Sequence, residues 1–571
     1  MESVPMTSPK KSTNEGRRDF LKIAITAIIA GAIAGVGGWM LKPTGVIERT
    51  VTKTETVTVT VTQTQTPTPT ATPTKPLPDT VIIAWNAEIT SMDPHKYHRP
   101  IYVESPWDAL YDRYLKQDRN LKYHGGIIEK WEYVDKEMKV LDLYVRRNVL
   151  CHDGTPIDAD DVIFSLQRAA QPGMAYRGPF GNFEKFEKKG NYYIRAYQKK
   201  FFPAQIVWLG FLASFLIPKE PFEKAGEEAF FKNPVGTGPY KFVEWVPGSH
   251  LKLEAFEDYW EGPPPIKNVI FKETLDPGVR VAEVEAGTSD YTTEIPLKEW
   301  GRLSKMPHLK GLKNPVTDVV KLFVLPYYEE FADERVRLAL HYAIDKEKIC
   351  NDILLGFGIP VSTTEAPGYW AYPEDYKFPY DLEKAKKLME EAGYGPDNRL
   401  KIKVQTTQGW IARDREVIEA CVDMWKKIYV DATIEIYTVP MYFDYRKTGR
   451  LAHLALYMWS NATGDPINSV YYSMAPESPF SYWVGLKAAN KTDYTRLMDK
   501  LSEVLAPVIS EKDFEKRMEA AKKAAIFSTE HGLIIPLYQR VQPVVMNKNL
   551  DYEPWPQGWT RVKDMKWTGP K

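Results

Sequence analysis

The sequence predicts an α/β fold in which mixed β-sheets are covered by helices. Leu400, Ile402 and Val404 alternate with polar residues, as in a strand, and a second alternating run follows at 432–436. Between them, apolar residues recur every three or four positions from 418 to 428, the pattern of an amphipathic helix. Strand, helix and strand in this order form a βαβ unit, which builds parallel or mixed sheets that pack against helices.

Further helices are expected because their apolar residues fall on one face. They are predicted near 336–344, 381–393 and 514–525, and another should begin after Asp158, where Asp158 and Asp161 have the spacing of a capping box. A strand is expected at 241–245. None of the helical faces carries residues at the spacing of metal ligands or of a nucleophile and its base. We therefore interpret these helices as packing elements.

The composition excludes some classes of function. The 571 residues include 75 Lys and Arg against 75 Asp and Glu, so no global basic field favours nucleic acid. Aromatic residues make up 13% of the chain, more than a core needs if many of the rings are exposed. This excess of aromatic residues is the feature of the composition that needs an explanation.

The amino terminus has the pattern of an export signal or membrane anchor. Residues 23–41 carry no charge and form a segment long enough to span a bilayer. Five basic residues precede this segment. We expect 1–22 to be a cytoplasmic tail or export signal and 23–41 to be a transmembrane anchor or the apolar part of a signal peptide. Arg17 and Arg18 resemble a twin-arginine signal, with Gly16 where Ser or Thr is usual. An uncleaved anchor is preferred, because no good cleavage site closes the segment.

A stalk is expected to follow the anchor. Every even-numbered position from 50 to 74 is threonine, with valine interleaved early and proline late. Such a segment has no face to bury, so we interpret 42–78 as an extended Thr/Pro-rich stalk whose threonines are candidate glycosylation sites. The globular part should begin near Asp79 and lie outside the cell, attached to the membrane through the amino-terminal segment.

The sequence contains no recognisable catalytic machinery. No Gly-x-Ser-x-Gly motif is present, and no carboxylate pair stands out as an acid/base couple. His95 and His98 lie close together but lack a third ligand nearby, and the three cysteines are too scattered for a disulfide framework. We therefore expect a binding protein rather than an enzyme, with no cofactor and no metal.

Several segments carry a family resemblance. Residues 143–165, with His152-Asp153-Gly154-Thr155-Pro156 at their centre, resemble the long signature of the family 5 extracellular solute-binding proteins, the oligopeptide- and dipeptide-binding receptors of ABC importers. Six more segments resemble the family in the same order along the chain: 92–95, 234–240, 287–291, 333–345, 380–393 and 535–538. The resemblance thus extends from about residue 80 to the end of the chain.

The resemblance implies a bilobal fold like that of periplasmic binding proteins, with discontinuous lobes joined by a hinge. The expected boundaries are 79–125 with 230–315 and 535–571 for the core of lobe I, 126–229 for a lobe I subdomain, and 316–534 for lobe II. The ligand would be enclosed when the lobes close, and the closed receptor, a monomer, would deliver it to a permease driven by ATPase subunits.

One family motif departs from its usual pattern. Peptide-binding members carry a Trp-x-x-Asp-x-x-Asp-Pro segment whose first aspartate pairs with the free amino group of the ligand. Here Trp459, Asp465 and Pro466 match, but Ala462 stands where that aspartate belongs. An unpaired buried ammonium costs several kcal/mol, which puts a simple peptide with a free amino terminus in doubt. Asp465 is expected to be structural, unless a shift of the loop lets it substitute.

Two ligand classes remain open, oligopeptide and oligosaccharide. Sugars favour flat aromatic platforms and neutral hydrogen-bonding groups, which Trp410 and Trp459 with Asn461 would supply. Tyr97, His98 and Arg99 follow the turn where peptide binders line the cleft. The predicted ligand-binding residues are Trp459, Asn461, Ala462, Asp465, Trp410, Tyr97, His98 and Arg99.

The predicted function is a substrate-binding receptor of an ABC importer at the cell surface. The alternative is a surface-tethered glycoside hydrolase, since a stalk and exposed aromatic side chains suit that role equally. A structural surface protein is disfavoured because the chain shows no internal repeats.

Overall fold

The computed structural model describes residues 79–96, 104–211, 214–325, 328–478, 480–483 and 495–569. The predicted tail, anchor and stalk at 1–78 and the predicted ligand residues 97–99 lie outside this part of the chain. Within it, no helix is both long enough and apolar enough to cross a membrane.

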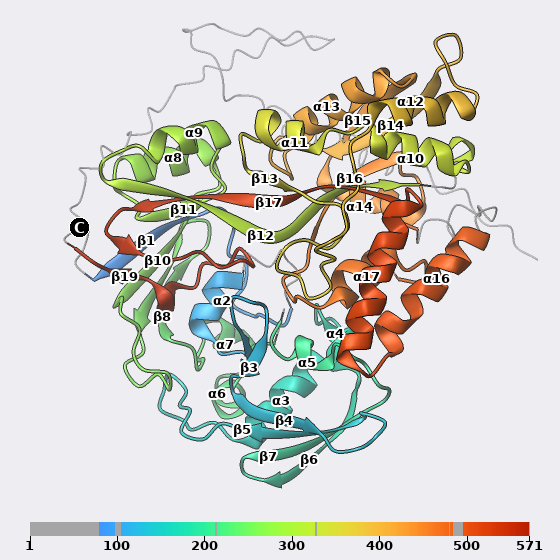
Figure 1. The fold of residues 1–571 in the computed structure, drawn as a ribbon. Coiled ribbons are helices and arrows are strands. Elements are labelled where there is room, and N and C mark those ends of the chain that lie inside the picture. Colours follow the sequence, from blue (N-terminus) through green and yellow to red (C-terminus); the bar gives the residue numbers. More distant parts are fainter. Residues whose placement is uncertain are drawn as a thin grey trace, which may run out of the picture. The chain divides into compact units, whose positions relative to one another are not determined.

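One 11-stranded sheet dominates the described chain (Figure 1). Its order is β15 (Val430–Tyr437), β14 (Leu400–Thr407), β16 (Leu454–Ser460), β12 (Leu309–Val324), β17 (Ile534–Asn547), β11 (Tyr291–Thr293), β1 (Thr80–Trp85), β10 (Asn268–Glu273), β9 (His250–Ala255) and β8 (Tyr240–Val246), and β13 (Gly358–Pro360) pairs with β17. Strands from the region expected to form lobe I therefore lie at one end of the sheet, and strands from lobe II at the other. The lobe boundaries themselves stay a prediction.

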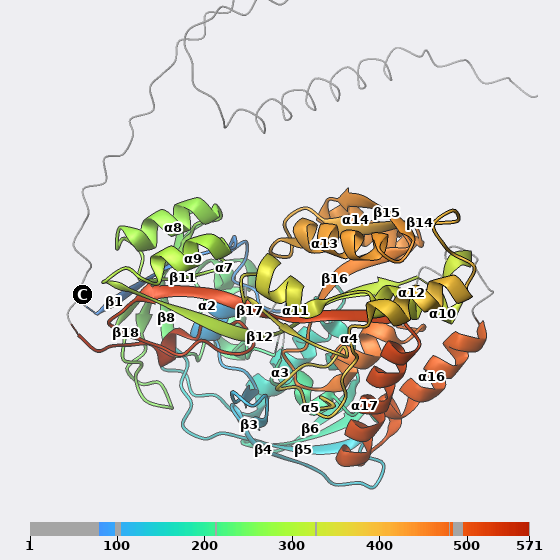
Figure 2. The same ribbon diagram turned by 45° about the horizontal axis from the view of Figure 1, so that its top comes forward.

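The two longest strands of this sheet, β12 and β17, join its two ends. They run antiparallel, with Leu309 opposite Asn547 at one end and Phe323 opposite Ile534 at the other. Figures 1 and 2 show them side by side through the middle of the fold. The register breaks between Pro315 and Val319, so that β12 carries a bulge at 316–318. A bulge bends its strand and increases the local twist.

A separate four-stranded antiparallel sheet lies in the region expected to be the lobe I subdomain. Its order is β4 (Ile128–Tyr133), β5 (Val140–Val145), β7 (Tyr193–Gln198) and β6 (Phe183–Gly190). The predicted capping box is confirmed beside it: Asp158 accepts from Asp160 N–H, and Asp161 accepts from Asp158 N–H at 2.9 Å, at the start of α3 (Ala159–Ala169). Two small sheets pair β2 (Leu115–Gln117) with β3 (Tyr123–Gly125), and β18 (Leu550–Asp551) with β19 (Lys566–Trp567).

The predicted βαβ unit is confirmed. β14 and β15 are parallel, and α13 (Asp414–Lys426), which connects them, packs on both. The other predicted helices correspond to α10 (Glu334–Tyr342), α12 (Leu382–Glu391) and α17 (Phe514–Glu530). The other helices of the described residues are α2 (Ser105–Leu110), α4 (Arg177–Phe180), α5 (Gln205–Trp208), α6 (Lys219–Ala225), α7 (Glu227–Lys232), α8 (Pro277–Glu285), α9 (Leu297–Leu303), α11 (Lys346–Lys348), α14 (Val439–Thr448) and α16 (Thr495–Ser510). They also include two π-helical segments, Ile349–Ile353 and Ile467–Tyr472, and two 3₁₀ helices, Glu329–Phe331 and Val562–Asp564.

The cores follow from these elements. β14, β15, β16 and part of β12 bury one cluster under α10, α12 and α13, and the subdomain sheet buries another against α3. The largest cluster lies between them and includes Ala462. Cys151, Cys350 and Cys421 are buried and free, as expected for Cys421 on the apolar face of its helix.

A buried ion network fixes the middle of the large sheet. Arg540 on β17 donates to Asp318 Oδ2 in the β12 bulge at 2.9 and 2.7 Å, and to Glu294 Oε1 beyond β11 at 2.6 Å. Burial alone raises the pKa of Glu294, but the Arg540 guanidinium outweighs it and holds that pKa below its usual range. Three strands are thus joined by one side chain where β12 is irregular.

Replacing Arg540 with methionine (Arg540→Met) should destabilise the fold. Asp318 is 5% exposed and would keep a buried charge without its partner, at a cost of about 3–5 kcal/mol. Arg335→Met is the matched control, because the Arg335–Asp333 pair is solvent-exposed and should cost less than about 1 kcal/mol. The measurement is the urea midpoint of each variant. Equal midpoints for the two variants would contradict the role assigned to Arg540.

Candidate functional site

The structure places most of the predicted ligand residues at one edge of the sheet. Trp459 lies near the end of β16, and Asn461, Ala462 and Asp465 follow in the next turn, while Trp410 follows β14. Because β14 and β16 are adjacent and parallel, their carboxyl ends meet at the same edge. In α/β sheets ligands bind at such an edge. Tyr97, His98 and Arg99 cannot be placed, since they lie outside the described residues.

The turn from 461 to 466 is buried and internally hydrogen-bonded. Asn461 donates its N–H to Thr317 O at 2.7 Å and its Nδ2 to Ser469 Oγ at 2.8 Å, and Thr463 Oγ1 donates to Asn461 Oδ1 at 2.7 Å. Gly464 has a φ of +75° and lies against Trp370, where a Cβ would meet the indole at 2.7 Å. These bonds hold the side chain of Asn461 within the turn.

Asp465 forms a buried ion pair with Arg517. Its two oxygens accept from Arg517 of α17 at 2.8 and 2.6 Å, and Asp465 is completely buried. A second buried pair of the same form joins Asp93 to Arg168 at 3.0 and 2.6 Å. The geometry therefore gives Asp465 a partner inside the protein, so its charge is already balanced before any ligand arrives.

Ala462 is also completely buried and belongs to the largest apolar cluster. At the position where the sequence departs from the resembled motif, the side chain is thus a methyl group packed among apolar neighbours.

An aromatic patch made of Trp410, Phe443, Tyr457 and Trp459 lies beside this turn. The ring centre of Tyr457 lies 4.9 Å from that of Trp410 and 5.9 Å from that of Trp459. The ring centre of Phe443 lies 5.7 Å from that of Trp410. All four rings are partly exposed. Tyr442 and Tyr482 are buried against the patch, and their hydroxyls are 2.8 Å apart. The two predicted tryptophans are therefore brought together through a tyrosine between them.

Sequence reasoning missed Tyr457 and Phe443. Tyr457 lies two residues before Trp459 on the same strand, so strand periodicity alone places both on one face. Phe443 carried no signal that distinguishes it from a core residue.

Two buried ionisable residues beside the turn were also missed. Lys321 of β12 and Glu365 are both 0% exposed. The ammonium of Lys321 donates to Thr364 Oγ1 and lies 5.7 Å from the ring centre of Trp459. Neither oxygen of Glu365 has a hydrogen-bond partner of normal geometry among the described residues, although the Ser469 hydroxyl is close enough to act on it. Lys321 interrupts an apolar run at 319–325, which was a signal in the sequence.

Burial shifts both pKa values toward neutrality. Desolvation raises the pKa of Glu365 to about 8, against smaller lowering effects of Ser469 and Lys321. Desolvation likewise lowers the pKa of Lys321 to about 7. The charge state of this pair therefore changes within the physiological range.

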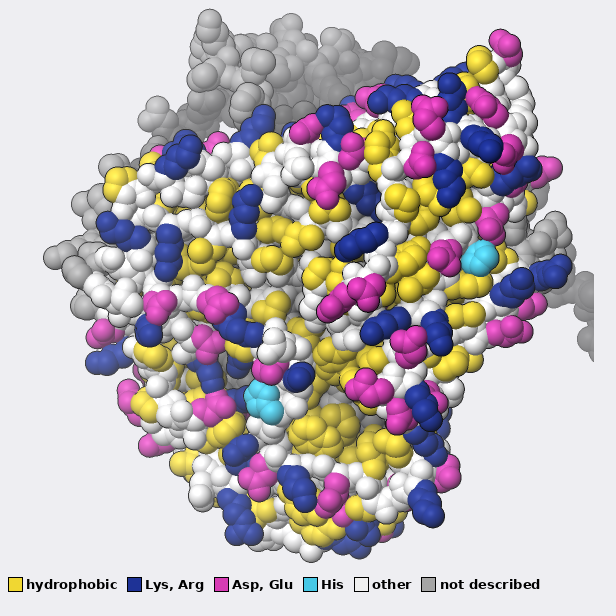
Figure 3. Space-filling view, in the orientation of Figure 1, with side chains coloured by type: hydrophobic (Ala, Val, Ile, Leu, Met, Phe, Trp, Pro, Cys, Tyr) yellow, Lys and Arg dark blue, Asp and Glu magenta, His cyan; other side chains and the backbone are white. Residues whose placement is uncertain are grey.

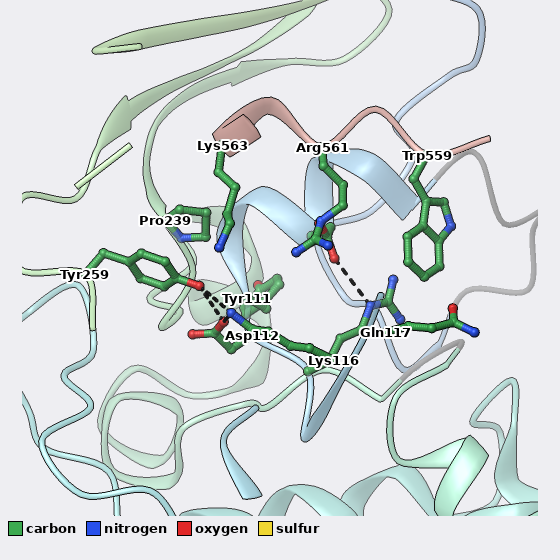
Figure 4. Close-up of a pocket in the computed structure, with 11 residues that line it drawn as sticks. Tyr111, Asp112, Lys116, Gln117, Pro239, Tyr259, Trp559, Arg561 and Lys563 are labelled. Carbon is green, nitrogen blue, oxygen red and sulfur yellow. Dashed lines mark hydrogen bonds and ion pairs between the residues drawn. The ribbon is translucent and has the colours of Figure 1, made fainter. Parts of the chain in front are cut away.

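A charged pocket lies between α2, β2 and the carboxyl-terminal segment. Figure 4 shows Arg561 and Lys563 reaching from that segment toward Asp112 and Lys116. Lys116 pairs with Asp112 at 3.3 Å and Glu261 at 2.7 Å, and Lys563 also contacts Glu261. With a volume of about 20 Å³, the pocket has room for about one water molecule. Its cations have carboxylate partners, so we interpret it as a structural ion network.

The turn also contacts the β2–β3 hairpin. Gln117 Nε2 donates to Thr463 O at 3.1 Å, and the Tyr123 hydroxyl donates to the same carbonyl at 3.3 Å. Gln117 in turn accepts from Gln557 at 2.8 Å. These bonds join the region expected for lobe I to the turn of lobe II.

No group of three or more His, Cys, Asp or Glu side chains in the described ranges is arranged to hold a metal ion. His95 Nε2 lies 2.8 Å from Phe215 O, and burial lowers its pKa to about 4. On the face shown in Figure 3, acidic and basic side chains are interspersed, in keeping with the balanced composition.

Comparison with known proteins decides the family. Residues 122–479 match the family described as bacterial extracellular solute-binding proteins, family 5. The chain belongs to this family. The sequence resemblance is thereby confirmed, and a family of solute-binding proteins agrees with a binding protein rather than an enzyme.

Similar proteins include two whose names describe peptide binding. This family 5 chain is 29% identical over 355 residues to the oligopeptide-binding protein AppA of Bacillus subtilis, an alignment that covers 58% of the chain and 64% of AppA. It is 27% identical over 430 residues to the dipeptide-binding protein of Escherichia coli, covering 70% of the chain and 78% of that protein. The chain thus spans less than two thirds of the length of AppA.

Solved structures show the same fold. The structure of HbpA2 from Haemophilus parasuis superposes with a TM-score of 0.73 at 22% identity, over 86% of this chain and 99% of that one. The predicted bilobal α/β fold of periplasmic binding proteins is confirmed at the level of the fold.

The stability of the chain should depend on pH through Glu365. Its pKa is raised on folding, so its contribution is full below the unfolded value near 4.5 and is lost as the pH rises through about 8. Between about pH 5 and 6, Lys321, whose pKa is about 7, is still mostly protonated, so the effect of Glu365 dominates. Over that window, the free energy of unfolding of the wild type should fall by about 1 kcal/mol relative to Glu365→Gln.

The measurement is urea unfolding of both proteins at a series of pH values. Glu347→Gln, on exposed α11, is the control and should follow the wild type. Parallel curves for the wild type and Glu365→Gln would show that the carboxyl group does not titrate abnormally.

Proposed function

We propose that this family 5 chain is the substrate-binding receptor of an ABC importer that captures short oligopeptides outside the cell and delivers them to the permease and its ATPase subunits. The observation that carries the proposal is the aromatic patch beside the 461–466 turn, at the family's ligand motif. The relatives named as oligopeptide- and dipeptide-binding proteins support the peptide class. Closure of two lobes around the ligand, by a monomeric receptor, completes the proposed mechanism.

The proposed peptide is recognised without an aspartate for its amino group. Ala462 offers no charge, and Asp465 is held by Arg517. Binding should then depend on the rings of the patch and on hydrogen bonds to the peptide backbone. Peptides whose amino terminus is blocked should bind about as well as free ones.

Oligosaccharide is a second candidate ligand. The partly exposed rings of Trp410 and Trp459 suit the flat faces of sugars, and the buried methyl group of Ala462 suits a neutral ligand. Membership of a family of solute-binding proteins does not favour the glycoside hydrolase alternative.

The amino-terminal segment is proposed to attach the receptor to the membrane. The support is the uncharged stretch 23–41, the basic residues before it and the Thr/Pro-rich stalk at 42–78. Fractionation of cells that express the full chain, before and after carbonate washing, tests this attachment.

The test of the ligand class starts from the purified full chain. Mass spectrometry of the small molecules released on denaturation identifies what the receptor retains. Calorimetric titration then compares a tripeptide, its amino-acetylated form and an oligosaccharide of similar size. We expect acetylation to change the affinity for the peptide less than threefold, roughly the effect of losing one weak contact. A loss of more than a hundredfold would mean that another carboxylate pairs with the amine.

Trp459→Ala should weaken binding of the retained ligand by roughly tenfold or more, as loss of an aromatic anchor does. Tyr380→Ala is the control, because Tyr380 is 48% exposed and is not part of the aromatic patch. Equal affinities for Trp459→Ala and the wild type would place the ligand elsewhere. Binding of the oligosaccharide but of neither peptide would replace the peptide class with the sugar class.

A further inference from the structure

A second cavity lies beside the β12 bulge, apart from the aromatic patch. This bulge cavity has a volume of about 220 Å³ and is bounded by Thr317 of the bulge, Gln539 of β17, Ile359 of β13 and the tip of the β2–β3 hairpin at Leu121. Of the predicted ligand residues that the structure describes, none lines it. Its floor is buried and its rim at Pro315, Pro367 and Gly368 is exposed, so a small molecule can enter.

The walls of the bulge cavity are mainly apolar and rigid. Leu121 and Ile359 supply aliphatic surface, and prolines, whose φ is fixed by the ring, form much of the rim. Arg119 also lines the cavity, but its guanidinium donates to Pro554 O at 2.9 Å and Glu553 O at 2.5 Å. The cavity thus offers no charge free of other partners. A cavity of about 150 Å³ already holds benzene, so this volume suits a single substituted ring.

Two polar atoms of the lining lack partners. The hydroxyl of Thr317 and the side-chain carbonyl of Gln539 are buried and have no hydrogen-bond partner among the described residues. The orientation of Gln539 is fixed, because its Nε2 donates to Val316 O at 3.1 Å and Pro367 O at 3.3 Å, which leaves Oε1 as an acceptor. An unpaired buried polar atom is costly, so a partner from outside the chain is favoured here.

We propose that the bulge cavity is a binding site for a small, neutral, mostly apolar molecule with one hydroxyl group, such as a phenol or a cyclic alcohol. Its hydroxyl donates to Gln539 Oε1 and accepts from the Thr317 hydroxyl, while its ring lies against Leu121 and Ile359. The site does not depend on the nature of the ligand at the aromatic patch, so the failure of either proposal leaves the other intact.

The test is titration of the full chain with phenol and with toluene, which matches phenol in size but lacks the hydroxyl. The affinity of each compound is obtained from a titration followed through the NMR signals of the ligand. Crystals soaked with 4-bromophenol then locate the ring by the anomalous signal of bromine. We expect phenol to bind about 3- to 10-fold more tightly than toluene, the contribution of one or two neutral hydrogen bonds. Equal binding of the two compounds, or bromine density elsewhere alone, overturns the proposal.

Two variants separate the polar from the apolar contribution. Thr317→Val removes a hydroxyl without a partner, so it should fold normally and reduce the preference for phenol over toluene. Ile359→Trp fills the cavity and should abolish binding of both compounds. Val243→Trp, on the 51% exposed position of edge strand β8, is its control. Phenol binding that survives Ile359→Trp unchanged overturns the proposal, and Thr317→Val keeps the test valid if the tryptophan variant does not fold.

Discussion

The pairing of β12 with β17 is the constraint on which the rest of the structure depends. These strands are long enough to join both ends of the large sheet, and they do so while one of them is bulged. A bulge leaves backbone groups outside the ladder, and here other segments pair with them. Thr317 N–H donates to Pro556 O, Thr317 O accepts from Asn461 N–H, and Val316 O accepts from Gln539. The carboxyl-terminal segment and the 461–466 turn are therefore positioned by one irregularity in a strand.

Charge compensation explains how polar groups are buried around the turn. Asp465 with Arg517, and Asp318 with Arg540, form buried ion pairs that balance their charges. Lys321 and Glu365 differ, since they are buried nearby without direct ion-pair geometry and have pKa values moved toward 7 and 8. The turn is thus held by paired ions, next to two groups whose pKa values burial moves toward neutrality.

The sequence predicted the elements whose signals are local. Alternation at 400–405 and at 432–436, the apolar stripe at 418–428 and the cap at Asp158 each depend on neighbouring residues, and each was found where expected. The meeting of Trp410 with Trp459 depends on the parallel pairing of β14 and β16, which no local pattern specifies. Likewise, Glu365 lies nearly a hundred residues from Ala462, and nothing in its own sequence neighbours marks it as buried beside the turn. The partner of Asp465 was hidden for the same reason, since Arg517 resembles any helical arginine.

The pairing of Thr317 has a mechanical consequence. Its amide and carbonyl are held by two segments far apart in the sequence, at Pro556 and Asn461, while its side chain lines the bulge cavity. A change of backbone conformation at this residue must alter both hydrogen bonds together. Thr317 therefore couples the two segments mechanically. A displacement of the carboxyl-terminal segment at Pro556 reaches the 461–466 turn through the two peptide groups that flank this one residue.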